Sequence, residues 1–70
     1  MKKIVSPMAG TVWKIVKAVG DEVEYGETIL ILESMKMEIP VEADSRGKIA
    51  KILVKEGEVV DQATLLIELS

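Results

Sequence analysis

One lysine near the middle of the 70-residue chain stands in a setting better suited to chemistry than to packing. Lys36 lies in the stretch Glu33-Ser34-Met35-Lys36-Met37-Glu38, between two methionines and then two acids. A cation flanked in this way has no evident role in a hydrophobic core, but its primary amine is a nucleophile. An enzyme that forms a Schiff base would need a buried, uncharged lysine, and two neighbouring glutamates provide the opposite environment. We therefore expect Lys36 to be an exposed amine that takes no part in catalysis.

The rest of the chain offers no second set of reactive groups. It contains no cysteine and no histidine, which removes thiolate chemistry, the usual general base and the commonest metal ligand. No glycine-rich phosphate loop, pair of catalytic carboxylates or nucleophile–base set is present in the sequence. We expect no catalytic residue and no metal site.

Composition narrows the class of protein further. Nine basic and twelve acidic residues give a formal charge of −3 without a basic stripe, which argues against a nucleic-acid partner. No apolar run approaches the roughly 20 residues that span a bilayer, so we expect no membrane segment and a cytoplasmic location. A hydrophobic content of 49%, rich in Ile, Val and Leu, favours an all-β core. At this length the chain is expected to be a single domain, residues 1–70.

The two halves of the chain resemble each other at an offset of 37 residues, which places Gly10 on Gly47 and Gly20 on Gly57. Apolar residues between the glycines also coincide. The matched positions include Val12 with Ile49, Val23 with Val60, Ile29 with Leu66, and Leu32 with Leu69. Each half is therefore predicted to be one supersecondary unit that packs against the other about a pseudo-two-fold axis. The four matched glycines are assigned to turns.

Short apolar segments separated by turn residues predict strands. The expected strands and short extended pieces are Lys2–Val5, Thr11–Val16, Val23–Glu24, Thr28–Leu32, Met37–Ala43, Lys48–Val54, Val60 and Leu65–Leu69. Val12 and Ile15 are three residues apart, as are Ile49 and Ile52, and this spacing predicts a bulge or a strong bend in each long strand. Pro40 predicts either an edge position for its strand or a backbone nitrogen that points away from the ladder.

Lys36 is predicted to lie at the tip of a hairpin. Propensity alone would allow a helix to begin at Ile29, but strict alternation resumes at Met37 and favours strand–turn–strand. A hairpin tip suits a modification site, because it is exposed yet supported by two paired strands. Met37 is in phase with the apolar residues of its strand and is expected to be half-buried, whereas Met35 is expected to be exposed. Two isolated aromatic residues, Trp13 and Tyr25, are interpreted as packing residues.

The whole chain resembles the biotinyl/lipoyl carrier domain family, and most of all its small single-domain biotin/lipoyl attachment proteins. Glu33–Met37 is similar to the family's attachment pattern Glu-Ala-Met-Lys-Met, with serine in place of alanine. The segment Ser6–Val12 resembles the family's Pro-Met-x-Gly segment. Gly20–Val23 and Gly57–Val60 resemble its paired Gly-Asp-x-Val turns. The resemblance implies a flattened β-barrel or sandwich of two four-stranded antiparallel sheets with quasi-two-fold symmetry.

The resemblance also implies a function, that of a non-catalytic biotin carrier. A biotin protein ligase would activate biotin as an adenylate, and the Lys36 amine would attack it to form an amide. Because exposed lysines are protonated at neutral pH, the ligase would have to remove the proton. The attached biotin would shuttle carboxyl groups between biotin carboxylase and carboxyltransferase. Recognition by the ligase or partners would fall on residues around Lys36, namely Glu33, Ser34, Met35, Met37 and Glu38.

Two alternatives remain open. Lipoate could be attached to the same lysine by a lipoyl ligase, for acyl transfer in 2-oxoacid dehydrogenases or related systems. The pair Met35 and Met37 favours biotin, since lipoyl domains more often place Asp and Ala around their lysine. An unmodified structural or interaction module would predict that Lys36→Arg changes nothing, and Glu33 and Glu38 could simply be solvated strand-end charges. If the chain is complete, the protein would act as a detached shuttle, expected to be a monomer. The other possibility is that the sequence is a fragment of a longer chain.

Overall fold

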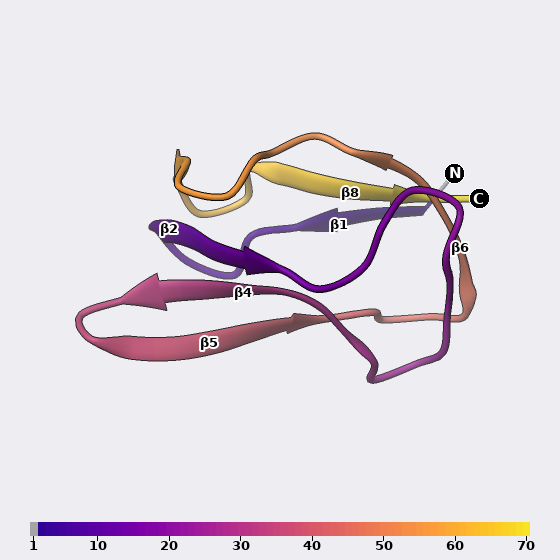
Figure 1. Ribbon diagram of the computed structural model, residues 1–70, viewed down its shortest axis with the longest axis horizontal. Coiled ribbons are helices and arrows are strands. Elements are labelled where there is room, and N and C mark those ends of the chain that lie inside the picture. Colours follow the sequence, from indigo (N-terminus) through magenta and orange to yellow (C-terminus); the bar gives the residue numbers. More distant parts are fainter. Residues whose placement is uncertain (1) are drawn as a thin grey trace.

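Eight strands form two four-stranded antiparallel sheets in the computed structural model, which describes residues 2–70 (Figure 1). The strands are β1 (Lys2–Val5), β2 (Gly10–Ile15), β3 (Glu22–Val23), β4 (Thr28–Ser34), β5 (Met37–Glu42), β6 (Gly47–Ile52), β7 (Val59–Val60) and β8 (Leu65–Leu69). The first sheet has the order β1-β8-β6-β3 and the second the order β5-β4-β2-β7. The predicted all-β class and the two-sheet architecture are confirmed.

The two sheets are related by the same 37-residue offset that relates the two halves of the sequence. A forward shift of 37 residues places β1 on β5 and β3 on β7, and a backward shift of 37 residues places β8 on β4 and β6 on β2. The order β1-β8-β6-β3 thus becomes β5-β4-β2-β7. Backbone hydrogen bonds follow the same relation. The amide of Val12 donates to the carbonyl of Glu58 at 2.8 Å, and the amide of Ile49 donates to the carbonyl of Asp21 at 2.9 Å. The pseudo-two-fold arrangement is therefore present at the level of single hydrogen bonds.

Both predicted bulges occur at equivalent places. The pairing register shifts between Val12 and Lys14 where β2 meets β4, and between Ile49 and Lys51 where β6 meets β8. An extra residue in each long strand keeps the apolar residues on both sides of the bulge directed inward. Pro40 lies in β5, an edge strand, where its missing amide hydrogen leaves the ladder intact.

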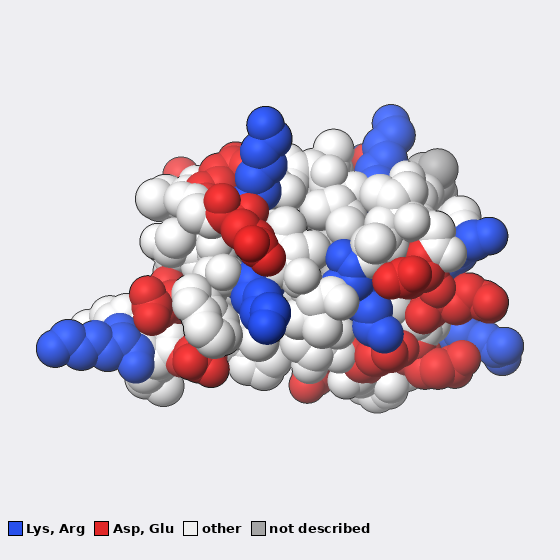
Figure 2. Space-filling view, viewed as in Figure 1, with Lys and Arg blue, Asp and Glu red and all other residues white. Residues whose placement is uncertain are grey.

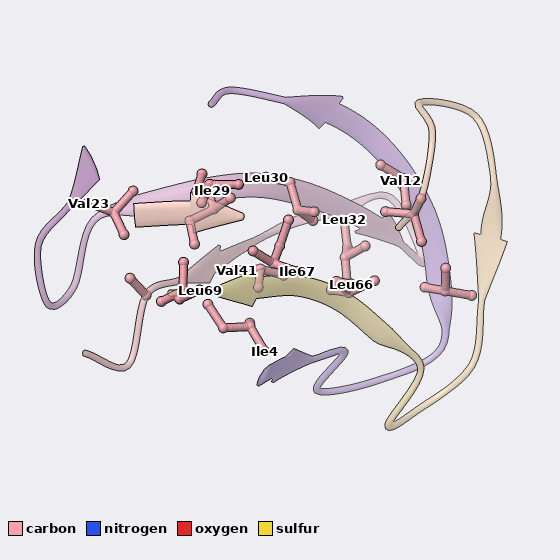
Figure 3. Packing of buried hydrophobic residues seen from close by; sticks show 14 residues of the cluster. Ile4, Val12, Val23, Ile29, Leu30, Leu32, Val41, Leu66, Ile67 and Leu69 are labelled. Carbon is pink, nitrogen blue, oxygen red and sulfur yellow. The ribbon is translucent and has the colours of Figure 1, made fainter. Parts of the chain in front are cut away.

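The core lies between the two sheets and is built from residues of both halves (Figure 3). Its buried side chains include the pseudo-symmetric pairs Ile4 and Val41, Val12 and Ile49, Val23 and Val60, Ile29 and Leu66, Leu30 and Ile67, and Leu32 and Leu69. Ser6 is the buried polar residue, and its hydroxyl donates to the carbonyl oxygen of Met8 at 2.6 Å. The interpretation of the aromatic residues as packing is wrong, because Trp13 is 47% exposed and Tyr25 is 80% exposed.

The four matched glycines fall into two groups. Gly20 and Gly57 have φ values of 96° and 91°, so their assignment to turns is confirmed. Gly10 and Gly47 were predicted to lie in turns, but they are the first residues of β2 and β6. A Cβ at Gly10 would approach the Glu33 carbonyl oxygen to 2.9 Å, and one at Gly47 would approach the Ser70 carbonyl oxygen to 3.0 Å. These two glycines permit the close approach of neighbouring backbones. The local pattern of glycine and proline in the sequence does not show that such an approach occurs.

The molecule is elongated, with extents of 31 × 18 × 17 Å. The turn between β4 and β5 occupies one end of the long axis, and the C-terminus and the beginning of β1 occupy the other (Figure 1). Within residues 2–70, no helix has the length and apolar character needed to cross a membrane. The fold thus isolates the β4–β5 turn at the end of the molecule farthest from the C-terminus.

Candidate functional site

The β4–β5 hairpin carries Lys36 on a two-residue turn. Strand pairing extends from Thr28 opposite Glu42 to Ser34 opposite Met37, which leaves only Met35 and Lys36 between the strands. Both residues have positive φ angles, 51° and 65°. Positive φ at both central residues characterises the type I′ turn, whose twist matches that of the flanking strands. The predicted position of Lys36 at a hairpin tip is confirmed.

The turn is built from residues that do not favour its backbone conformation. Type I′ turns prefer Asn-Gly or Asp-Gly, whereas this turn contains a methionine and a lysine. The left-handed conformation costs a residue with a Cβ roughly 1–2 kcal/mol. Pairing along the whole of β4 and β5 holds both residues in that conformation. The Lys36 backbone therefore has a fixed position and direction, although its side chain extends into solvent.

The Lys36 side chain is exposed and free of local partners. The ion pairs among residues 2–70 join Lys17 to Glu27 and Arg46 to Glu24, and no hydrogen bond in this part of the chain involves the Lys36 amine. Figure 2 shows a basic side chain extending from the end of the molecule where the β4–β5 turn lies. On the face in view, basic and acidic side chains are interspersed, with no large basic region. An incoming enzyme can reach this amine without first breaking an ion pair.

The two flanking methionines are both exposed. Met35 is 91% exposed, as expected, and it precedes Lys36 in the turn. Met37 was expected to be half-buried but is 64% exposed. Its phase in β5 is as predicted, because it alternates with Glu38 and shares a face with Ile39, but the hairpin extends beyond the core at this point. Opposite Met37 stands Ser34, and β2 begins at Gly10, which brings no side chain to cover either residue.

Glu33 and Glu38 stand directly opposite each other one pair below Ser34 and Met37. Both are exposed, and neither forms an ion pair with another residue of the described chain. The β2 strand passes close behind this part of β4, since a Cβ on Gly10 would lie 3.5 Å from the Cβ of Ser34. The predicted recognition residues thus gather around Lys36 on one hairpin, with Ser34 the only half-buried member among them.

The surroundings of Lys36 contain no catalytic apparatus. Within residues 2–70 no group of three or more acidic residues is arranged to hold a metal ion. A shallow groove runs between the edge strands β1 and β5, and its lining includes Ile4, Val5, Pro40 and Val41 rather than turn residues. The arrangement can therefore present an amine to another protein, and within residues 2–70 this amine has no hydrogen-bond or ion-pair partner.

The comparisons with known proteins agree with this geometry. The family described as "Biotin-requiring enzyme" matches residues 2–69. The chain is 48% identical over 63 residues to a biotin/lipoyl attachment protein of Bacillus subtilis (strain 168), covering 90% of this chain and 86% of that protein. It is 46% identical to the biotin carboxyl carrier protein of acetyl-CoA carboxylase of Pyropia yezoensis, covering 93% of this chain but only 47% of that protein.

A solved structure extends the likeness to a second class of carrier. The lipoyl domain of the 2-oxoglutarate dehydrogenase complex from Azotobacter vinelandii superposes with a TM-score of 0.82 at 32% identity, covering 100% of this chain and 96% of that domain. The family assignment therefore rests on agreement over nearly the whole chain, well beyond the attachment tripeptide.

Proposed function

The chain belongs to the biotin/lipoyl family of biotin-requiring enzymes, and we propose that it carries covalently attached biotin on the side chain of Lys36. The observation that carries this proposal is the position of Lys36 at the tip of a rigid two-residue turn, exposed and without an ion-pair partner among residues 2–70. The flanking pair Met35 and Met37 favours biotin over lipoate. In this role the chain is a carrier and does not itself catalyse a reaction.

The residues present fit the attachment of biotin. Attachment requires a single amine that an enzyme can surround, and Lys36 lies in the β4–β5 turn, which occupies one end of the molecule (Figure 1). The amine loses a proton to the ligase and attacks the activated carboxyl group, so that a C–N bond forms as the activating group leaves. The resulting amide removes the positive charge of Lys36. Once attached, biotin supplies the atom that carries a carboxyl group.

The hairpin contributes position and reach. Paired strands fix the point from which the modified side chain extends, and the side chain supplies the mobility. We place a biotin protein ligase, a biotin carboxylase and a carboxyltransferase as the successive partners of this hairpin. Carboxylase partners are supported by the relative described as the carrier protein of acetyl-CoA carboxylase. We also propose that the carrier works in the cytoplasm, where ATP is available for the activation of biotin, and that it acts as a monomer.

Lipoyl carriage is the second candidate function. It is favoured by the superposition on a lipoyl domain and by the name of the attachment protein from Bacillus subtilis, which covers both groups. The fold and the amine would be the same, but the partners would transfer acyl groups.

The carrier function is tested by labelling. The biotinylated chain is incubated with a biotin carboxylase, ATP and labelled bicarbonate, and the label retained on the protein is counted. Label is expected on the wild-type chain and not on Lys36→Arg treated in parallel with the ligase. A biotinylated wild-type chain that accepts no label, under conditions in which free biotin does, would contradict the proposal.

A further inference from the structure

The pseudo-symmetry supplies an internal comparison between the outer faces of the two sheets. In the first sheet, Glu68 of β8 stands opposite Lys3 of β1 on one side and Lys51 of β6 on the other. Residues directly opposite in antiparallel strands point to the same face, so this row alternates in charge across the sheet. A row of alternating charges is typical of a sheet face that is exposed to solvent, and such a face does not need to be covered by another protein.

The equivalent row of the second sheet is largely apolar. Ile31 of β4 occupies the place of Glu68, and it stands opposite Pro40 of β5 and Lys14 of β2. Pro40 replaces Lys3, so the only charge retained in the row is that of Lys14. Because the backbone arrangement of the two sheets is the same, the difference lies in the side chains alone.

Two further exposed apolar side chains lie next to this row, one in the β2 bulge and one in the neighbouring cross-strand row. Trp13, the extra residue of the β2 bulge, is 47% exposed and stands where β6 has Ala50. Val59 of β7 is 75% exposed and stands where β3 has Glu22. We call these four residues the outer patch: Trp13, Ile31, Pro40 and Val59.

Two carboxylates form the margin of the outer patch on the side of the turn. Glu33 and Glu38 are directly opposite each other, and the same cross-strand row continues through Thr11 to Val59. Like charges directly opposite each other destabilise a strand pair, and neither glutamate has an ion-pair partner among residues 2–70. A protein that places Lys or Arg side chains against this pair would remove the repulsion.

We propose that the outer patch is the surface on which the enzyme that acylates Lys36 docks, with an apolar contact centred on Trp13 and Ile31 and basic side chains facing Glu33 and Glu38. This inference rests on the proposed function. Ile31 and Pro40 of the patch lie on β4 and β5, the two strands that carry the turn, so a protein seated on the patch is held at a fixed distance from Lys36. Large aromatic side chains near the centre of an interface are the type of residue that contributes most to binding.

The length of the unmodified side chain explains why this partner, rather than a carboxylase, needs the patch. Before modification, the enzyme must bring its active site to an amine on an ordinary lysine side chain, so contact with the neighbouring strands is unavoidable. It must also distinguish Lys36 from other exposed lysines, such as Lys48 and Lys55. After modification, the reactive group is at the end of a longer arm, and partners can act from a greater distance.

The proposal is tested by the kinetics of biotin attachment to the full chain by a purified biotin protein ligase. Trp13→Ala and Ile31→Glu are compared with matched controls on the other sheet, Ala50→Ser and Glu68→Gln. Ile31→Glu copies the residue that the first sheet tolerates at the equivalent position, and thermal unfolding verifies that each variant is folded. We expect both outer-patch variants to lose about tenfold or more in kcat/KM through a higher KM, with kcat retained and the controls within twofold of wild type.

A second readout concerns the charges at the margin. Glu33→Gln with Glu38→Gln is expected to weaken the salt dependence of kcat/KM, because the steering charges are removed. Folded Trp13→Ala and Ile31→Glu variants that are modified like wild type would overturn the docking proposal while leaving Lys36 as the attachment site. Equal losses in the controls would overturn it as well, as would concentration-dependent self-association that Trp13→Ala abolishes. A wild-type chain that the ligase does not modify at all would instead refute the proposed function, and the docking proposal with it.

Discussion

Among residues 2–70, three residues other than glycine adopt a left-handed backbone, and two of them are Met35 and Lys36 of the turn. The third, Ala63, has a φ of 70° and no part in the candidate site. Its pseudo-symmetric equivalent is Gly26, with a φ of 84°. The two halves thus share a turn geometry in which one half has the favoured residue and the other does not.

Ala63→Gly is expected to stabilise the protein by about 0.5–1 kcal/mol, since relief of the left-handed strain exceeds the entropy that glycine adds to the unfolded chain. Urea unfolding measures the change. The reverse substitution, Gly26→Ala, is expected to cost about 1 kcal/mol although no atom lies within 4 Å of the new Cβ. A loss of stability in Ala63→Gly would show that the alanine side chain makes a compensating contact.

The ion pair between Lys17 and Glu27 makes stability depend on pH. Its hydrogen bond lowers the pKa of the Glu27 carboxyl, helped by the amide of Glu24, and raises the pKa of the Lys17 ammonium. A carboxyl with a lowered pKa stabilises the fold above its unfolded pKa, and that contribution is lost as the pH falls through the folded value. The raised pKa of the Lys17 ammonium has the corresponding effect at alkaline pH. It stabilises the fold below the unfolded pKa of the lysine, and that contribution is lost as the pH rises through the folded pKa.

Lys17→Gln is therefore expected to lower the urea midpoint at pH 7 and to have a smaller effect at pH 2.5. Arg46→Gln is the control, because Arg46 and Glu24 are 3.4 Å apart with side chains 78% and 69% exposed, and it should change little at either pH. Equal effects of Lys17→Gln at both pH values would mean that packing of the lysine stem matters and the charge does not.

At the scale of elements, the close approach of β2 to β4 supports the hairpin. Gly10→Ala is expected to destabilise the fold by about 1–3 kcal/mol, because the new methyl group would displace the Glu33 carbonyl. It should also lower the rate at which a ligase modifies Lys36, since the displaced strand leads directly to the turn. Gly47→Ala is the matched control, with a similar contact at Ser70 but at the other end of the molecule. Equal modification rates in the two variants would show that the packing of β2 against β4 does not affect how the turn presents Lys36.

Much of the element order could be predicted from the sequence because the two halves of the chain repeat the same pattern of strands and turns. The 37-residue offset aligned turns and strands. The spacing of Val12 and Ile15 required a bulge or a strong bend, and the structure has a bulge there. The position of the lysine at a hairpin tip followed from the alternation that resumes at Met37. Alternation predicts which face of a strand a residue lies on, but not how far along the strand the core extends. The exposure of Met37 was therefore not predicted.

Tertiary proximity was the other feature that local patterns did not contain. The role of Gly10 depends on a carbonyl 23 residues away in β4, and no local punctuation signals it. The left-handed Ala63 has only one sequence signal, its alignment with Gly26 in the repeat. The exposure of Trp13 depends on the direction in which the bulge turns its side chain, which spacing alone leaves open.

At the scale of the whole molecule, both halves of the chain contribute buried residues to one core. Leu32 and Leu69 are equivalent and both 0% exposed. Leu32→Ala and Leu69→Ala are each expected to cost about 2–5 kcal/mol, a large share of the roughly 5–15 kcal/mol that stabilises a typical domain. Urea unfolding of both variants measures the costs. A cost below about 1 kcal/mol for either would show that its half of the sandwich can repack or is not part of one cooperative core.

The central claim, that Lys36 carries biotin, is tested most directly by the intact mass of the protein isolated from cells with their own ligases. Peptide mapping locates any added mass, and Lys36→Arg serves as the control. We expect an increment of one biotin on the peptide that contains Lys36, absent from the variant. An increment of one lipoyl group would keep the site and replace the function, and an unmodified mass that persists when biotin ligase is supplied would contradict the claim.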